Sequence, residues 1–220
     1  MSEYILRNAT KDDIPYLANV VIGAEKGNSN KLSYSTFFNL SEEQVRSYII
    51  RMFEEEVDGC EFSLSSYLLY EYEGNPVASV GGWIEGFGGE VPSKILKSNL
   101  IAYTFNPESL EFVKTKSDLI KEFQAEREPM TLQIEYCYLS RRHRGIGLAE
   151  NLFKRHQENA ISAYPAIKKA QVQVFKINTL SIRLCESVGF KIARTYKSSN
   201  KEILNYLPSD EKCILEKELQ

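Results

Sequence analysis

The sequence lacks several features that would assign it to a specialised class of protein. Its 220 residues hold no internal repeat and no low-complexity stretch, and the apolar run at residues 17–24 is far too short to cross a bilayer. The 27 basic residues are outnumbered by 30 acidic ones, so no excess of positive charge points to nucleic acid. We therefore expect neither a membrane nor a nucleic acid as a partner.

Cysteine is also scarce, and its spacing fits no metal motif. The four cysteines, Cys60, Cys137, Cys185 and Cys213, lie far apart in the chain. Residues 1–7 carry charges and are not followed by a long apolar stretch, so we expect no secretory signal. The cysteines are then expected to be free thiols, and the location to be cytoplasmic. The sequence predicts no metal site.

The composition that is present, 43% hydrophobic and 26% charged residues, is typical of a globular domain. The turn and hydrophobic patterns predict strands at 4–8, 66–72, 76–83, 131–139, 169–175, 190–197 and 212–217. They predict helices after the caps at Thr10 and Ser41, and at 147–162 and 179–188. Residues 26–36 have the composition of a loop. Strands that alternate with helices favour an α/β fold with a mixed sheet, as one domain over residues 1–220.

Residues 86–128 interrupt this pattern. They contain Gly88-Gly89, Pro92 and Pro107, and then a charged stretch from 114 to 128 that fits one amphipathic helix. We interpret the segment as an insertion between two strands, and such insertions often carry substrate specificity. A surface excursion without a role is the alternative.

The junction at residues 139–149 carries a chemical signal. A predicted strand ends there, and a turn with Arg142, Arg144, Gly145 and Gly147 leads into a predicted helix. The glycines let the backbone approach a ligand closely, the first helical turn offers unpaired N–H groups, and the arginines add charge-assisted donors. The turn is neither a P-loop nor a dinucleotide fingerprint, because the Gly-Lys-Ser/Thr and the third glycine are missing. It suits a diphosphate; a helix start with incidental glycines is the alternative.

Two blocks of residues, 142–147 and 172–190, occur in a recognisable order. The first reads Arg, two residues, Gly, one residue, Gly; the second is a strand, then Asn178, a helix, and Gly189-Phe190. With both blocks in register, the chain resembles the GNAT superfamily of N-acyltransferases. The resemblance implies a central twisted mixed β-sheet of about seven strands, with splayed central strands and flanking helices. The segment 86–128, between the third and fourth strands, is not covered by it.

The resemblance implies a site for coenzyme A. In the family, the pantetheine arm lies in the cleft between the splayed strands and bonds to their backbone, and the pyrophosphate binds the glycine turn. A backbone N–H near Tyr138 would polarise the thioester carbonyl. Asn178 lies beside the pantetheine, or only caps the next helix. The implied coenzyme-binding residues are Cys137, Tyr138, Leu139, Arg142, His143, Arg144, Gly145, Ile146, Gly147, Leu148 and Asn178.

An amine acceptor arrives as ammonium and must lose a proton, so the reaction requires a base. The resemblance favours Glu135, because the family often places a glutamate on the strand before the motif. Burial beside the cleft would raise its pKa toward neutrality. An exposed acid in an ion pair is the alternative for Glu135. Glu85, at the end of the hairpin, is the second candidate, and water relayed from either carboxylate is the third.

The general acid, which would give a proton to the departing sulfur, is harder to assign. The family usually has a tyrosine where this chain has Cys185. A thiol has a pKa near 8.5 and could donate weakly to the departing sulfur. A small apolar residue on the buried face of the helix is the interpretation that we favour. Tyr136, Tyr138 and Tyr196 are the available substitutes. His156 lies near the apolar stripe of its helix and is expected to serve packing or the surface.

These features predict an N-acetyltransferase in which a primary amine attacks acetyl-CoA directly in a ternary complex. The acceptor would be a small molecule or a peptide amine, and a homodimer stays open. The acidic residues 54–58, with Glu42 and Glu43, could attract a cationic acceptor, although a solvated helix face explains them as well. The alternative function is a coenzyme A-binding sensor or interaction module with little catalysis, which the missing tyrosine favours.

Overall fold

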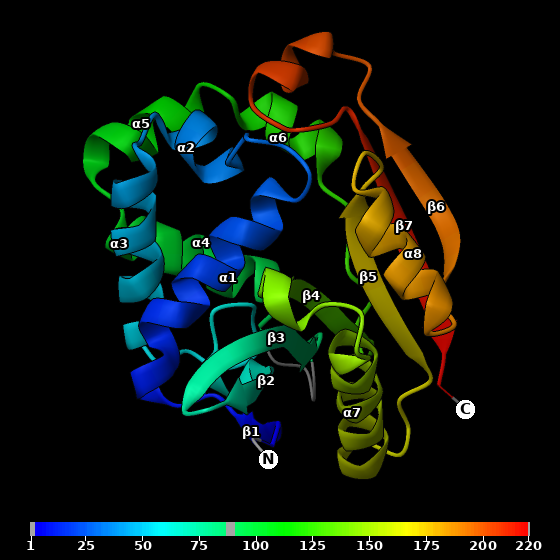
Figure 1. Ribbon diagram of the computed structural model, residues 1–220. Coiled ribbons are helices and arrows are strands. Elements are labelled where there is room, and N and C mark those ends of the chain that lie inside the picture. The colour runs from blue at the N-terminus through cyan, green and yellow to red at the C-terminus, as the bar shows by residue number, and fades with distance from the viewer. Residues whose placement is uncertain (1–2, 87–90, 220) are drawn as a thin grey trace.

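Seven strands form one mixed sheet in the order β1-β2-β3-β4-β5-β7-β6 (Figure 1). The computed structural model describes residues 3–86 and 91–219. The strands are β1 (Ile5–Asn8), β2 (Tyr67–Tyr72), β3 (Asn75–Ile84), β4 (Leu132–Leu139), β5 (Lys169–Phe175), β6 (Lys191–Lys197) and β7 (Glu211–Glu218). Neighbouring strands are antiparallel, except that β4 and β5 pair in parallel. The predicted α/β class with a mixed seven-stranded sheet is confirmed.

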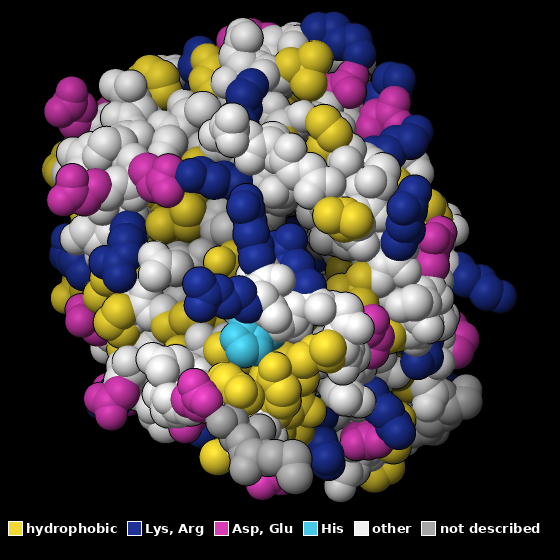
Figure 2. All heavy atoms as spheres, in the orientation of Figure 1, with side chains coloured by type: hydrophobic (Ala, Val, Ile, Leu, Met, Phe, Trp, Pro, Cys, Tyr) yellow, Lys and Arg dark blue, Asp and Glu magenta, His cyan; other side chains and the backbone are white. Residues whose placement is uncertain are grey.

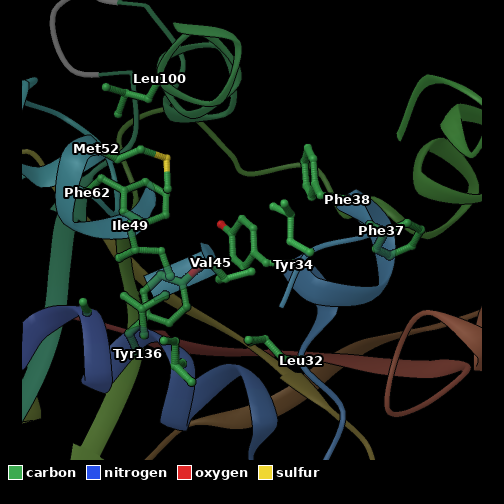
Figure 3. Close-up of a cluster of buried hydrophobic side chains, with 14 of the residues drawn as sticks. Leu32, Tyr34, Phe37, Phe38, Val45, Ile49, Met52, Phe62, Leu100 and Tyr136 are labelled. Carbon is green, nitrogen blue, oxygen red and sulfur yellow. The ribbon is translucent and has the colours of Figure 1, made fainter. Parts of the chain in front are cut away.

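Helices cover both faces of this sheet (Figure 1). They are α1 (Ile14–Lys26), α2 (Ser33–Phe38), α3 (Glu42–Glu54), α4 (Ser93–Thr104), α5 (Pro107–Lys114), α6 (Ser117–Phe123), α7 (Leu148–Ala163) and α8 (Thr179–Ser187). One cluster of buried side chains joins α1–α6, and a second joins the sheet to α7 and α8. Figure 3 shows part of the first cluster, where Tyr34 of α2 lies between Phe38 and the side chains of α3.

Local signals account for several element boundaries. The Ser41 hydroxyl accepts a hydrogen bond from the Gln44 amide (3.2 Å), and the Gln44 side chain accepts one from the Ser41 amide (2.9 Å). These reciprocal bonds form a capping box at the start of α3 and satisfy two backbone amides that have no acceptor within the helix. Glu73 and Gly74 have φ of 51° and 75°, the left-handed pair that a two-residue hairpin turn requires. Gly189, with φ of 93°, ends α8.

Two predictions of local structure are wrong. The sequence predicts a loop at 26–36, but α2 begins at Ser33. This six-residue helix is too short to be stable alone, and burial of its aromatic residues in the first cluster stabilises it. The charged stretch 114–128 is not one helix either: α6 ends at Phe123, and the backbone is then extended, which turns Arg127 toward the protein interior.

The segment 86–128 lies between β3 and β4, as predicted, and contains α4, α5 and α6. These helices pack beside α2 and α3, on the face of the sheet that α1 covers (Figure 1). Gly88-Gly89 lie outside the described residues.

His156 of α7 is a packing residue. Its side chain is 7% exposed, and its Nε2 lies 2.9 Å from the Val80 carbonyl oxygen. The ring rests on Gly82 of β3, where a Cβ atom would come within 2.6 Å of Nδ1. A strand residue with a side chain would displace the imidazole.

Acid is expected to destabilise the fold through His156. Burial lowers the pKa of this imidazole from 6.5 to about 4, so the unfolded chain binds the proton more readily. The neutral His156 ring contributes fully to the free energy of unfolding above pH 6.5. This contribution, about 3 kcal/mol in all, is lost as the pH falls toward 4. Urea unfolding from pH 7 to 4 checks this: His156→Gln should be the less stable protein at pH 7, and the difference should shrink at pH 4. A constant difference would contradict it.

Candidate active site

The central strands β4 and β5 separate along their length. They pair only at Leu132–Ala170 and Gln133–Gln171, near their amino-terminal ends. Beyond these pairs β4 remains bonded to β3, and β5 remains bonded to β7. The two strands therefore open like a V toward their carboxyl ends. On this face the surface is hollowed between α1 and β5, and Lys and Arg side chains gather around the hollow (Figure 2).

A β-bulge lies in β4 beside this opening. The register between β3 and β4 shifts between Ser79 and Gly81, so Tyr136 and Cys137 together face one residue of β3. Tyr136 has a φ of 53°, a strained conformation for a residue with a side chain. The Tyr136 and Tyr138 side chains both pack toward α1, whereas Cys137 packs in the cluster of α7 and α8.

One backbone amide beyond the bulge faces the opening. The Ser140 amide donates to the Val77 carbonyl of the β3 side (2.9 Å). Because amides alternate in direction along a regular strand, the Leu139 amide points away from β3 and toward β5. The Tyr138 amide, in contrast, points toward β3.

The glycine turn follows directly. Gly145 and Gly147 have φ of 77° and 84°, and a Cβ added at either position would meet no atom within 4 Å. In the described part of the chain, the amides of residues 144–150 have no acceptor; the first bond at the start of α7 runs from the Asn151 amide to the Gly147 carbonyl (3.0 Å). Unpartnered amides at a helix N-terminus beside open space fit a diphosphate.

The side chains of the turn differ in their environment. Arg142 is exposed, and Arg144 Nε donates to the Leu139 carbonyl (3.3 Å). His143 Nδ1 lies 2.8 Å from the Tyr4 hydroxyl, and its ring also packs against Tyr72. The histidine thus connects the turn to β2 and to the residue that precedes β1.

The last turns of α1 lie against both sides of the opening. A Cβ at Gly23 would meet the Tyr138 ring of β4 at 2.8 Å, and one at Gly27 would meet the Asn178 amide nitrogen at 2.9 Å. Asn178 Oδ1 also accepts a bond from the Ser181 amide (3.3 Å), so it caps α8. The carboxyl end of α1 therefore bridges the two splayed halves of the sheet.

A cavity of about 640 Å³ lies next to this end of α1. Much of its wall comes from the 86–128 segment, including Lys97, Ile101, Ile120 and Phe123. Glu25 of α1 lines it, and Glu25 Oε1 accepts a bond from the Tyr136 hydroxyl (3.4 Å). The inserted segment thus forms one side of a pocket, and Glu25 on its wall connects the pocket to the bulged strand through the bond from Tyr136.

Comparison with known proteins identifies the fold. No protein-family model matches the sequence, and no curated protein matches it. Among solved structures, an N-acetyltransferase from Staphylococcus aureus Mu50 gives a TM-score of 0.64 at 16% identity, over 97% of this chain and 100% of that one. A GNAT-family acetyltransferase from Streptococcus pneumoniae gives 0.52 at 13% identity, over 99% and 100%. This chain has the GNAT fold.

A third structure with the GNAT fold, from Salmonella typhimurium, was solved with its cofactor acetyl-CoA. It gives a TM-score of 0.56 at 14% identity, over 100% of this chain and 95% of that one. None of the helices in the described ranges has the length and apolar character needed to cross a membrane. Within those ranges, no three His, Cys, Asp or Glu side chains are grouped so that they could hold a metal ion.

Glu135 lies within the GNAT fold at the expected place on β4, but in an ion pair. Its Oε1 is 2.6 Å from Arg127 Nη2, and both side chains are largely buried. Arg127 also lies 3.4 Å from the fully buried Glu61 and over the Trp83 ring. The Arg127 guanidinium therefore occupies the Oε1 atom of the carboxylate that the sequence assigns as the base. The basic role of Glu135 stays a prediction.

Glu85, the second candidate, is fully hydrogen-bonded. Its two carboxylate oxygens accept bonds from the Ser93 amide (2.9 Å) and the Ser93 hydroxyl (2.5 Å), and Trp83 Nε1 lies 3.3 Å from one of them. Glu85 is 3% exposed and fixes the start of α4. These bonds explain a buried acid at the end of β3 without any catalytic role.

Cys185 is 1% exposed, on the inner face of α8. Burial raises the pKa of its thiol to about 12, and burial likewise raises that of Cys137 to about 12. Both thiols are therefore neutral near pH 7. The burial of Cys185 agrees with its interpretation as a small apolar residue on the inner face of the helix. Among the substitute tyrosines, Tyr138 packs on α1, and Tyr196 lies on the edge strand β6.

Cys185→Ala is expected to leave the turnover number within a few-fold of wild type, because a neutral, buried thiol is a poor proton donor. Stability should fall by about 1 kcal/mol through the small cavity. Steady-state thiol release, together with thermal unfolding, measures both. A loss of turnover of about a hundredfold in a folded protein would instead make the thiol the acid.

Glu25 is a functional candidate that sequence reasoning misses. Burial raises the pKa of its carboxyl group, and Lys97 offsets this only in part. Its position in the last turn of α1 adds to the effect, since the negative end of a helix disfavours an anion. An acid at a helix C-terminus, where a base is usual, is the one local signal that could have drawn attention to it.

Proposed function

We propose that this protein is an acetyl-CoA-dependent N-acetyltransferase that acts on a primary amine. The observation that carries the proposal is the meeting of the β4–β5 opening with a glycine turn whose amides, at residues 144–150, have no acceptor. A diphosphate on these amides and a pantetheine arm along the opening would occupy backbone donors that are otherwise unsatisfied. The acetyl-CoA complex of a protein with the same fold supports this arrangement.

Acetyl-CoA supplies an acetyl thioester to this site. The amide of Leu139 is directed toward the opening and would donate to the carbonyl oxygen as negative charge develops there. The amine nitrogen bonds to the acetyl carbon, the carbon–sulfur bond breaks, and coenzyme A leaves as a thiolate. Because this thiolate is a tolerable leaving group, the scheme needs no dedicated acid at Cys185.

Glu25 is the group that we assign to the amine and its proton. It lines the cavity, accepts a bond from Tyr136 at the bulge, and lies between Gly23 and Gly27, which face Tyr138 and Asn178. A raised pKa suits a base that works near neutrality. In contrast to Glu135, it is not in an ion pair with any described residue. The ammonium would therefore supply a missing partner.

The experiment that tests this function measures thiol release from acetyl-CoA across a panel of primary amines. We expect turnover with at least one amine and formation of the acetylated amine by mass spectrometry. Glu135→Gln and Glu25→Gln are compared in parallel, because the larger loss of turnover identifies the base. Tight binding of coenzyme A without turnover of any amine would instead favour a sensor or interaction module.

A further inference from the structure

The cavity beside Glu25 has the size and lining of a small-molecule site. Its volume of about 640 Å³ lies within the usual range for such pockets. Apolar side chains form most of its wall, among them Phe37, Phe38, Phe123 and Phe175. The Tyr34 hydroxyl is buried in this lining and has no hydrogen-bond partner among the described residues. Figure 3 shows this hydroxyl directed away from α2.

Most charged side chains around the cavity already have partners. The ion pairs are Glu61–Lys97, Glu61–Arg127, Arg127–Glu135 and Lys94–Glu126. Glu85 is satisfied by Ser93. Apart from Glu85, which Ser93 satisfies, Glu25 and Lys212 are the cavity-lining charges that form no ion pair within 4 Å in the described structure. One acid and one base are therefore left to face the same space.

Lys212, on β7, is held mainly by weak contacts. Its Nζ donates to the Phe123 carbonyl over 3.4 Å and lies 5.1 and 5.8 Å from the ring centres of Phe123 and Phe175. Burial lowers the pKa of its ammonium to about 8, although Glu135 and Glu25 act in the opposite direction. A bound anion would give this cation the partner that the described residues do not provide.

We propose that the acceptor is a small zwitterion: its ammonium binds Glu25, its carboxylate binds Lys212, and its apolar body lies against the phenylalanines between them. This inference rests on the proposed function. The Tyr34 hydroxyl is a second donor within the same lining for a polar group of the acceptor. A free amino acid with an apolar side chain has this chemistry, whereas the amino terminus of a peptide has no carboxylate beside its amine.

Matched pairs of acceptors test the inference on the wild-type protein. Leucine is compared with isoamylamine, phenylalanine with phenethylamine, and tryptophan with tryptamine, by thiol release from acetyl-CoA. In each pair that reacts, we expect the amino acid to have the higher kcat/KM by about tenfold or more, the value of one charge-assisted bond. Equal or better reaction of the amines without a carboxylate would overturn the inference and leave the acetyltransferase function standing.

Lys212→Met then tests the assigned residue. It should raise KM for the amino acid by about tenfold or more and lower kcat/KM for the matched amine far less, so that the preference for the amino acid is lost. Thermal stability should stay the same or rise, since a buried ammonium is replaced by an apolar chain of similar length. Lys197→Met, which removes an exposed lysine paired with Glu211 (2.7 Å), is the control and should change neither. Equal losses for both acceptors would give Lys212 a merely structural role and contradict the assignment.

Calorimetry separates this inference from the function itself. With coenzyme A present as a product that cannot transfer, phenylalanine should bind to the wild-type protein and bind about tenfold more weakly to Lys212→Met. Binding without turnover would refute the acetyltransferase and keep the zwitterion site. Turnover of amines without any binding of phenylalanine, leucine or tryptophan would refute the zwitterion site and keep the acetyltransferase function.

Discussion

Gly145→Glu is expected to weaken the binding of coenzyme A by about 100-fold or more. The new carboxylate would stand beside the unpartnered amides of residues 144–150, in the space where the phosphates are expected. Loss of two charge-assisted bonds alone corresponds to about 3 kcal/mol, and like-charge repulsion adds to it. Isothermal titration of coenzyme A into the folded variant measures the effect.

Gly74→Glu is a closely matched control for this substitution. Gly74 has a φ of 75°, close to the 77° of Gly145, and a Cβ there also meets no atom within 4 Å. Both variants therefore carry the same backbone strain and the same added charge, but Gly74 lies in the β2–β3 turn. We expect Gly74→Glu to bind coenzyme A with wild-type affinity. Equal affinities of the two variants for coenzyme A would show that the phosphates do not bind at the glycine turn.

Glu25→Gln is expected to lower kcat by about 100- to 1,000-fold, the usual contribution of a general base. KM for the coenzyme should not change. The base is active only when it has lost its proton, so wild-type activity should fall as the pH drops through the raised pKa of Glu25. The charged groups around it are Lys97, Glu135 and Lys212. In Glu25→Gln this acidic limb of the pH profile should be absent.

Glu43→Gln, on the exposed face of α3, is the matched control and should retain full activity with an unchanged pH profile. The comparison with Glu135→Gln is decisive. If Glu135→Gln removes the acidic limb and Glu25→Gln retains it, the base is the carboxylate on β4, and the Arg127 ion pair opens during the reaction. Circular dichroism and thermal unfolding establish that each variant is folded.

The elements that position the coenzyme could be predicted from the sequence because their signals are local. Two glycines with positive φ, three arginines and a strand-to-helix junction lie within ten residues at 139–148. The downstream Asn178 and Gly189 are likewise local caps, one on each end of α8. The seven-stranded sheet followed from the same blocks through the family resemblance.

The acceptor side could not be predicted, because it depends on contacts between distant segments. Glu25 of α1 and Lys212 of β7 meet at one cavity, whose wall comes largely from the insertion. Arg127, which pairs with Glu135, lies in a stretch that the sequence predicted to be one amphipathic helix. In each case burial and pairing, which a single sequence does not encode locally, decide what the charge does.

A crystal structure of the protein with coenzyme A tests the central claim most directly. The account predicts the pyrophosphate on the amides of residues 144–150 and the pantetheine between β4 and β5, with its sulfur near the bulge at Tyr136 and Cys137. It also predicts that Glu25 and the adjoining cavity remain open beside that sulfur. A coenzyme bound elsewhere, with the amides of the glycine turn left to solvent, would contradict it.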